Sequence, residues 1–235
     1  MNLDEIDNNW KKTPEDFRND SLKFHSWFDP CDSIRGTISQ GHIDFHTKIL
    51  TDEVYKCLGD VKKKSCLEIG FGGGRLVNAA SCVFSRVLGI DIHTCFDLTE
   101  DFLQKQGAIN YTLLHYDERE KIENESIDFI FSFIVFQHFG RIQTFYDYLD
   151  LVDRVLTKDG CCNIYFGKNK WNNENFFIKD DVQEKTGYCT MFYKPEFVKD
   201  CLDNRGFQII SEGQRTKSPW VRDLSGQFYV TFKRK

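Results

Sequence analysis

Hydrophobic and polar positions along the first 60 residues follow a helical rhythm. From Met1 to about Asp60 the chain is polar, with scattered aromatic residues that would serve as packing anchors. Within the stretch His42–Leu58, positions that suit the buried face of one amphipathic helix recur three or four residues apart, namely Ile43, His46, Leu50, Val54 and Leu58. We therefore expect residues 1–60 to form a helical N-terminal extension.

Beyond residue 60, short apolar runs alternate with amphipathic stretches. The pattern predicts strands at residues 64–70, 86–92, 109–117, 127–136 and 161–167, with helices between them at 75–84, 97–107 and 141–156. The run at 127–136 is apolar on both faces, as in a central parallel strand. Strand–helix alternation with short connections predicts a parallel sheet covered by helices on both faces.

The last third of the chain interrupts this alternation. Residues 168–192 show no clear period and mix aromatic with polar side chains. A loop of this length within a compact domain is usually functional or disordered. The pattern then predicts a helix over 194–207 and two closing strands at 207–213 and 227–233. We expect one domain over residues 61–235, with a lid inserted at about 168–192.

Composition narrows the class of protein and its partners. The chain has 235 residues, and its 22 phenylalanines predict an aromatic core. The formal net charge of −5 argues against a nucleic-acid partner, which normally requires a clustered basic face. With no signal-peptide pattern at the start and no apolar run near ~18 residues, we expect a cytoplasmic protein without a membrane segment. None of the nine cysteines has C-x-x-C spacing, which argues against a zinc or thioredoxin-type site.

The stretch CLEIGFGGGR, residues 66–75, places four glycines in five positions directly after an apolar run. A dinucleotide loop would need a third glycine where Arg75 stands, and a P-loop would need a lysine after its last glycine. Instead, Glu68 stands two positions before Gly70, and Gly72 and Gly74 follow. Such a loop suits the close approach of a ligand without phosphate, and a carboxylate beside it favours bound positive charge.

This motif resembles the first motif, [DE]-x-G-x-G-x-G, of the Rossmann-like (class I) S-adenosylmethionine-dependent methyltransferases. The resemblance extends from about Lys64 to Phe232 and includes RVLTKDG, which is similar to the family's turn before the fifth strand. It implies an α/β fold with a seven-stranded, mostly parallel sheet, helices on both faces and the last strand antiparallel. It also implies S-adenosyl-L-methionine as cofactor, with S-adenosyl-L-homocysteine as product.

The resemblance assigns roles within the glycine loop. Glu68 would place the methionine part of the cofactor, and the backbone would lie against its adenosyl portion at Gly70, Phe71, Gly72 and Gly74. Arg75 could reach the cofactor carboxylate or could lie exposed at a helix start.

Later positions extend the predicted cofactor site. Asp91 ends the second predicted strand, where a carboxylate can accept both ribose hydroxyls, and Ile92 follows it. Asp117 ends the third strand, where the family usually has an acid near the adenine amino group, although a solvated turn is an equal reading. Ser132, in the fourth strand, completes the predicted set.

Methyl transfer is an in-line displacement for which positioning supplies most of the acceleration. A hydroxyl acceptor also needs a general base. His138 follows the fourth strand, on the ligand side of an open α/β sheet, and is the predicted base; a structural histidine at a helix start is the alternative. The residues predicted to contact the acceptor are Trp27, His42, Gln137, Trp171 and Tyr188.

The acceptor is expected to be a small polar metabolite, such as a sugar or sugar nucleotide, methylated on oxygen. The segment Ser132–His138 contains neither the [DN]-P-P-[YF] motif of amino-methylating DNA enzymes nor the acidic ligands of magnesium-dependent catechol enzymes. A phenolic or amine acceptor and a non-catalytic cofactor-binding scaffold remain alternatives. His42 and His46 lack a third ligand, so no metal is expected. Either a monomer or a homodimer is compatible with the sequence.

Overall fold

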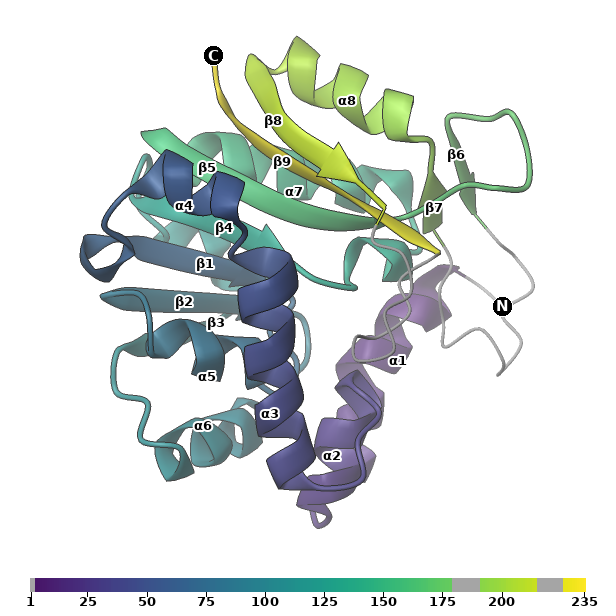
Figure 1. The fold of residues 1–235 in the computed structure, drawn as a ribbon. Coiled ribbons are helices and arrows are strands. Elements are labelled where there is room, and N and C mark those ends of the chain that lie inside the picture. Colours follow the sequence, from purple (N-terminus) through teal and green to yellow (C-terminus); the bar gives the residue numbers. More distant parts are fainter. Residues whose placement is uncertain (1–2, 179–190, 215–225) are drawn as a thin grey trace.

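The computed structural model describes residues 3–178, 191–214 and 226–235. Seven strands form one sheet in the order β3-β2-β1-β4-β5-β9-β8 (Figure 1). The strands are β1 (Ser65–Ile69), β2 (Arg86–Asp91), β3 (Tyr111–His115), β4 (Ile127–Ser132), β5 (Leu156–Gly167), β8 (Phe207–Gly213) and β9 (Gln227–Arg234). Strands β1 to β5 pair in parallel, whereas β9 is antiparallel to both of its neighbours. The predicted mostly parallel sheet with an antiparallel last strand is therefore confirmed.

Helices cover both faces of this sheet. The helices of one face are α5 (Arg75–Ser81) and α6 (Phe96–Lys105), and those of the other are α7 (Ile142–Val155) and α8 (Pro195–Asn204). Along β4, Phe129 and Phe131 pack into the first layer, and Ile130 packs into the second. Burial on both faces explains why the strand reads as a continuous apolar run. Within the described residues, no helix is long and apolar enough to cross a membrane.

The N-terminal extension is helical, but its main predicted helix is wrong. The elements are α1 (Leu3–Asp16), α2 (Ser21–Phe28), α3 (Ile34–Asp44), a π-helical turn (Phe45–Ile49) and α4 (Asp52–Leu58). The expected single helix over 42–58 breaks because Thr51 caps a new helix: its hydroxyl accepts from the Val54 amide, and acidic residues occupy the next turn. Figure 1 shows α1, α2 and α3 as a V on one side of the molecule.

Two further expectations need correction. Strand β4 ends at Ser132 rather than residue 136, because Ile134 adopts a left-handed φ of 63° that a strand cannot accommodate. The segment 168–192 is not wholly irregular, since β6 (Phe176–Ile178) pairs antiparallel with β7 (Met191–Tyr193). Residues 179–190 of the predicted lid lie outside the described residues.

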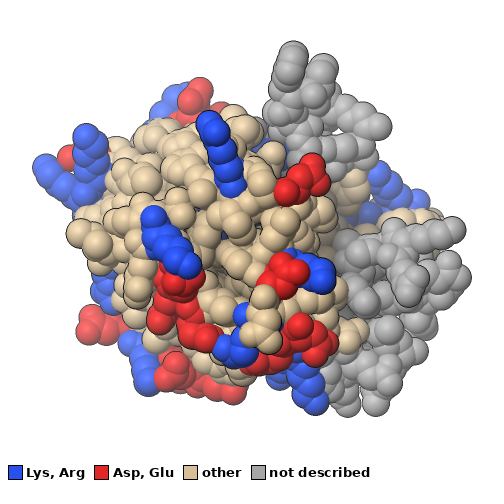
Figure 2. Space-filling model, turned by 90° about the horizontal axis from the view of Figure 1, so that it is seen from below, with Lys and Arg blue, Asp and Glu red and all other residues tan. Residues whose placement is uncertain are grey.

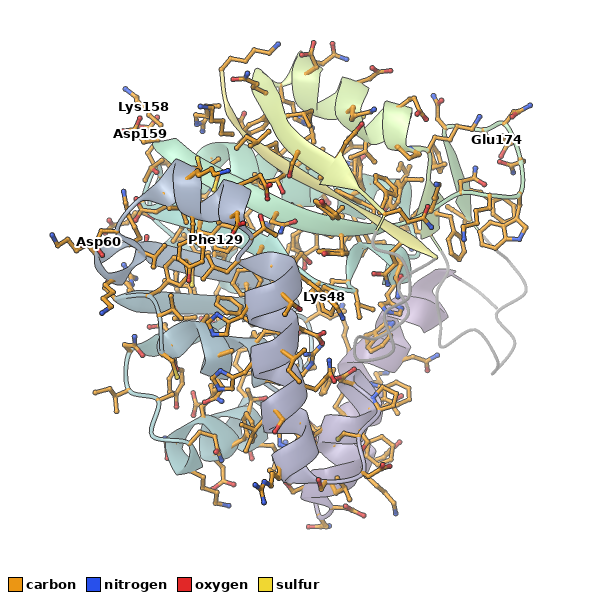
Figure 3. The ribbon with its side chains drawn as sticks, viewed as in Figure 1. Lys48, Asp60, Phe129, Lys158, Asp159 and Glu174 are labelled. Carbon is orange, nitrogen blue, oxygen red and sulfur yellow. The ribbon has the colours of Figure 1, made fainter. Side chains whose placement is uncertain are left out.

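Helix α3 packs closely on the start of α5. A Cβ atom at Gly41 would lie only 2.6 Å from the carbonyl oxygen of Arg75, so the two backbones touch. Just beyond α3, the ammonium group of Lys48 lies 2.5 Å from the Asp44 carboxylate, and both side chains are fully buried. Figure 3 shows Lys48 beside α3 in the interior, whereas Lys158 lies at an outer edge of the molecule. The extension is thus part of the packed interior.

Replacing Gly41 by Ala should destabilise the protein by about 1–3 kcal/mol, because the new methyl group meets backbone that cannot move aside. Urea unfolding followed by circular dichroism measures this change. Gly36→Ala is the matched control on the same helix, where a new Cβ meets the Ser33 hydroxyl at 3.2 Å and no backbone of another element. Alanine there should be neutral or stabilising by about 0.5–1 kcal/mol. Equal effects of the two substitutions would contradict close packing of α3 on α5.

Candidate active site

A cavity of about 210 Å³ lies at the carboxyl ends of the central strands. This is the edge at which open α/β sheets bind their ligands. Its wall includes seven predicted cofactor residues, Glu68, Gly70, Phe71, Gly72, Arg75, Asp91 and Ile92, together with the predicted base His138. The sequence motifs therefore converge on one cavity.

The glycines of the loop are required by backbone conformation and by packing. Gly70 and Gly72 have left-handed φ angles of 79° and 49°, which side-chain-bearing residues rarely adopt. A Cβ at Gly70 would lie 2.3 Å from the Val135 side chain, and one at Gly72 would lie 2.8 Å from the ring of Phe28. The loop is consequently pressed between α2 and the segment after β4.

Glu68 is a buried carboxyl group that lines the cavity and has one unsatisfied oxygen. Its side chain is buried, and Oε2 has no hydrogen-bond partner among the described residues. Burial raises the pKa of Glu68 well above its ordinary value, and the nearby positive charge of Arg75 opposes this rise only in part. A cationic ligand in the cavity would supply the missing donor and favour the ionised carboxylate.

Asp91 ties the glycine loop to the end of β2. Its Oδ2 accepts a hydrogen bond from the amide of Gly72 at 2.7 Å, and its Oδ1 accepts from the amide of Ile92 at 2.6 Å. Oδ1 also accepts from the amide of His93 at 3.3 Å, so the lone pair that remains for a ligand is on Oδ2. Because Glu68 and Asp91 line the same cavity, the carboxylates predicted for opposite ends of the cofactor face a common space.

Arg75 is held by carboxylates of the N-terminal extension. Its Nε lies 3.1 Å from Oδ2 of Asp29, and its Nη1 lies 2.8 Å from Oδ2 of Asp44. The other oxygen of Asp44 meets Lys48, which completes a buried chain of alternating charges. Arg75 is therefore not an exposed residue at a helix start. Its predicted contact with a cofactor carboxylate stays a prediction.

His138 lies on the cavity wall beside the aromatic side chain of Trp10, with ring centroids 4.5 Å apart. The side-chain amide nitrogen of Gln137 lies 3.3 Å from Nε2 of His138. The side-chain oxygen of Gln137 accepts a hydrogen bond from the Gln227 amide at 2.7 Å. An amide nitrogen can only donate, so this contact favours the neutral tautomer with Nε2 as the basic nitrogen. Gln137, predicted to contact the acceptor, instead lies behind His138 and outside the cavity wall.

Three predicted cofactor residues do not reach the wall. The Asp117 side chain is 80% exposed and pairs with His115 in a 3₁₀ turn, because β3 ends before it. The Ser132 hydroxyl donates to the carbonyl of Ile69 at 2.8 Å and joins β4 to β1. Gly74 caps the start of α5. The geometry gives no support to direct ligand contacts from these three side chains or backbones.

The predicted acceptor residues are not gathered at the cavity either. Trp27 packs on Trp10 at 5.5 Å and supports the wall from behind. The ring of His42 stacks on the ring of His46, one helical turn further along the chain. Trp171 is 60% exposed and packs on Phe192. Tyr188 lies outside the described residues.

The structure adds wall residues that sequence reasoning missed. From α2 come Phe28 and His25, whose Nδ1 is buried without a hydrogen-bond partner among the described residues. Burial lowers the pKa of His25 to about 4, so the ring is neutral at physiological pH. Asp147 and Tyr148 come from α7. In the sequence, the aromatic residues of the extension were the one sign that α2 packs against another part of the protein. The helical period of α7 does not show which of its residues reach the cavity.

Potential metal ligands are scattered over the described part of the chain. No group of three or more His, Cys, Asp or Glu side chains there could hold a metal ion. The eight cysteines that the structure describes are free thiols.

Comparisons with known proteins agree with this geometry. Residues 67–164 match the family model of a methyltransferase domain. A solved S-adenosylmethionine-dependent methyltransferase from Methanosarcina mazei is similar with a TM-score of 0.62 at 16% identity, covering 79% of this chain and 98% of that one. A solved methyltransferase of the same kind from Aquifex aeolicus has a TM-score of 0.55 at 17% identity, covering 86% of this chain and 98% of its own. Another from Mesorhizobium loti has a TM-score of 0.58 at 14% identity, covering 77% of this chain and 95% of its own. At these identities the likeness concerns the fold. The sequence matches no curated protein significantly.

Replacing Glu68 by Gln should stabilise the ligand-free protein at neutral pH. Because the folded-state pKa lies above the ordinary value of 4.5, the unfolded chain loses this proton first as the pH rises. The wild type therefore loses stability from about pH 4.5 up to the folded-state pKa, whereas glutamine has no proton to lose. Urea unfolding at a series of pH values should show a small difference near about pH 4 and a growing advantage of the variant above it. A difference that does not change with pH would contradict a raised pKa.

Proposed function

We propose that this class I, Rossmann-like S-adenosylmethionine-dependent methyltransferase transfers its methyl group to an oxygen atom of a small polar metabolite. The methyltransferase domain includes residues 67–164. The observation that carries the cofactor assignment is the shared cavity of Glu68 and Asp91, with the glycine backbone between them. The oxygen acceptor is the finer part of the proposal and rests on the surroundings of His138.

The wall residues fit S-adenosylmethionine in charge and hydrogen bonding. Glu68 would receive the ammonium group of the methionine part, which would satisfy its unpaired Oε2. Asp91 would accept from a ribose hydroxyl through the remaining lone pair of Oδ2. When bound, the cofactor supplies a methyl group activated by the sulfonium. The protein supplies position, a dry pocket and a place for the acceptor proton.

His138 is proposed as the general base, acting through Nε2. The pair Gln137 and Gln227 holds the ring from behind, so the 3.3 Å contact from the Gln137 amide must break and the ring must turn toward the cavity before Nε2 takes a proton. Trp10 fixes the other side of the imidazole. A base held this way can remove the hydroxyl proton as the new carbon–oxygen bond forms.

A small acceptor is favoured by the enclosure and by the surface charge. Trp10, Lys11, His25, Phe28 and Asp29 of the extension all contribute to the wall, so the extension covers the cavity. On the face drawn in Figure 2, lysine and arginine side chains are interspersed with acidic ones, without a continuous basic patch among the described residues. Aromatic walls with a few polar groups suit sugars and other amphipathic metabolites.

Binding of S-adenosylhomocysteine tests the cofactor assignment. Calorimetry should show binding of S-adenosylhomocysteine but not of NAD. Asp91→Asn should weaken that binding by about 10²-fold, because charge-assisted hydrogen bonds are worth about 1.5–3 kcal/mol each. Asp60→Asn, at the periphery of the molecule in Figure 3, is the control and should bind as the wild type does. Tighter binding of NAD would replace the proposal by a nicotinamide enzyme.

The role of His138 can be tested once an acceptor is found. Incubation with methyl-labelled S-adenosylmethionine and a panel of sugar nucleotides, phenols and amines identifies the acceptor class. His138→Ala should then lower turnover of a hydroxyl acceptor by about 10²–10⁴-fold while leaving S-adenosylhomocysteine affinity near the wild-type value. Full turnover in this variant would remove His138 as the base. Label on amines alone would overturn the oxygen acceptor.

A further inference from the structure

Two buried glutamine side chains stand in line behind His138. Gln227, at the start of β9, donates through its side-chain amide to the side-chain oxygen of Gln137 at 2.7 Å. The side-chain nitrogen of Gln137 in turn lies 3.3 Å from Nε2 of His138. Gln137 is 7% exposed and Gln227 is 8% exposed, so water competes little for these contacts. The three side chains form a hydrogen-bonded chain that runs from the sheet to the cavity wall.

The backbone on both sides keeps the two amides within reach of each other. Gln227 pairs with Gly167 at the end of β5, and a Cβ atom at Gly167 would lie 3.1 Å from the Cβ of Gln137. The 3₁₀ turn that carries Gln137 is held by the buried hydroxyl of Tyr193, which donates to the carbonyl of Phe136 at 3.1 Å. The main freedom that remains to the pair is the orientation of each terminal amide, with oxygen toward one neighbour and nitrogen toward the other.

The two amide orientations are coupled, because a hydrogen bond needs one donor and one acceptor. When Gln227 presents its nitrogen, Gln137 presents its oxygen to Gln227 and its nitrogen to His138. An amide nitrogen that faces Nε2 can only donate, so the neutral imidazole carries its proton on Nδ1. If Gln227 presented its oxygen instead, Gln137 would turn over, and its own oxygen would need a proton on Nε2.

The other side of the Gln227 amide favours the first of these orientations. Its oxygen, Oε1, is buried without a hydrogen-bond partner among the described residues. If the amide turned over, its nitrogen would take that place. As for backbone groups, a buried amide donor without a partner is rarer than a buried carbonyl oxygen without one. The nitrogen of Gln227 is therefore expected to face Gln137.

We infer that Gln227 is a positioning residue that acts through Gln137 to keep Nε2 of His138 free of its proton. The consequence for catalysis rests on the proposed function. Once the imidazole turns toward the cavity, Nε2 offers a lone pair to the acceptor hydroxyl, whereas an Nε2–H group would meet that hydroxyl as a second donor. Gln227 lies 90 residues from Gln137 in the sequence, so the segment around His138 gives no sign of it.

Nuclear magnetic resonance of ¹⁵N-histidine-labelled protein tests this inference, since long-range proton–nitrogen correlations read the tautomer of a neutral imidazole. The protein has six histidines, and the spectrum of His138→Ala identifies the His138 signals by their loss. The wild type should show the Nδ1–H tautomer. Gln227→Met keeps the length of the side chain but removes the amide, so Gln137 can turn over. The ratio of Nδ1–H to Nε2–H should then fall by about 2–10-fold, the effect of one hydrogen bond on an equilibrium.

Two further variants complete the comparison. Gln137→Glu can still accept from Gln227, but its carboxylate only accepts, so it should reverse the tautomer to Nε2–H. Gln208→Met changes an exposed glutamine of β8 and should keep the wild-type ratio.

An Nε2–H tautomer in the wild type, an unchanged ratio in Gln227→Met, or the wild-type tautomer in Gln137→Glu would each overturn the inference. Calorimetry with S-adenosylhomocysteine on the same samples should give near wild-type affinity for Gln227→Met, which shows that the variant is folded. A wild type that shows the expected tautomer but does not bind S-adenosylhomocysteine would overturn the proposed function and support the hydrogen-bonded chain.

Discussion

The cavity depends on the buried ion pairs that fasten the N-terminal extension to the start of α5. Arg75 meets Asp29 at the end of α2 and Asp44 at the end of α3, and all three side chains are almost fully buried. A buried charge left without its partner is costly, so both helices are held where Arg75 is neutralised. That placement lays Phe28 on Gly72 and closes the space above the glycine loop.

The sheet could be predicted from the sequence because its physical causes are local. Strands buried on both faces read as unbroken apolar runs, and α7 shows a clear three-and-four spacing that its buried face confirms. The break between the π-helical turn and α4 could not be predicted in this way. The apolar spacing continues through it, and the decisive features are a threonine cap and the hydrogen bonds that Asn163 and Tyr165 of β5 donate to the carbonyl groups of the π-helical turn.

The candidate site was predictable only where the backbone conformation and the reactive side chains belong to one short segment of the sequence. Glu68 and the glycines lie within ten residues, and Asp91 ends the adjacent strand, so their convergence follows from parallel pairing. Asp29 and Asp147 reach the cavity from helices far away in the sequence. Their placement is a property of helix packing, which no spacing along the chain encodes. Asp117 lies outside the cavity wall for a different reason, since β3 ends at His115 rather than at residue 117 and leaves the Asp117 side chain in solvent.

The hydrogen-bond character of the cavity argues for a ligand rich in donors. Glu68, Asp91 and Asp147 offer acceptors at three separate points of the wall. The ammonium group, the ribose hydroxyls and the adenine amino group of S-adenosylmethionine are all donors. A pyrophosphate would need free backbone amides at the glycine loop, but the amide of Gly72 already donates to Asp91. An anionic bridge there would also face the Asp91 carboxylate. The same bond that shapes the loop thus disfavours a dinucleotide and leaves room for a phosphate-free cofactor.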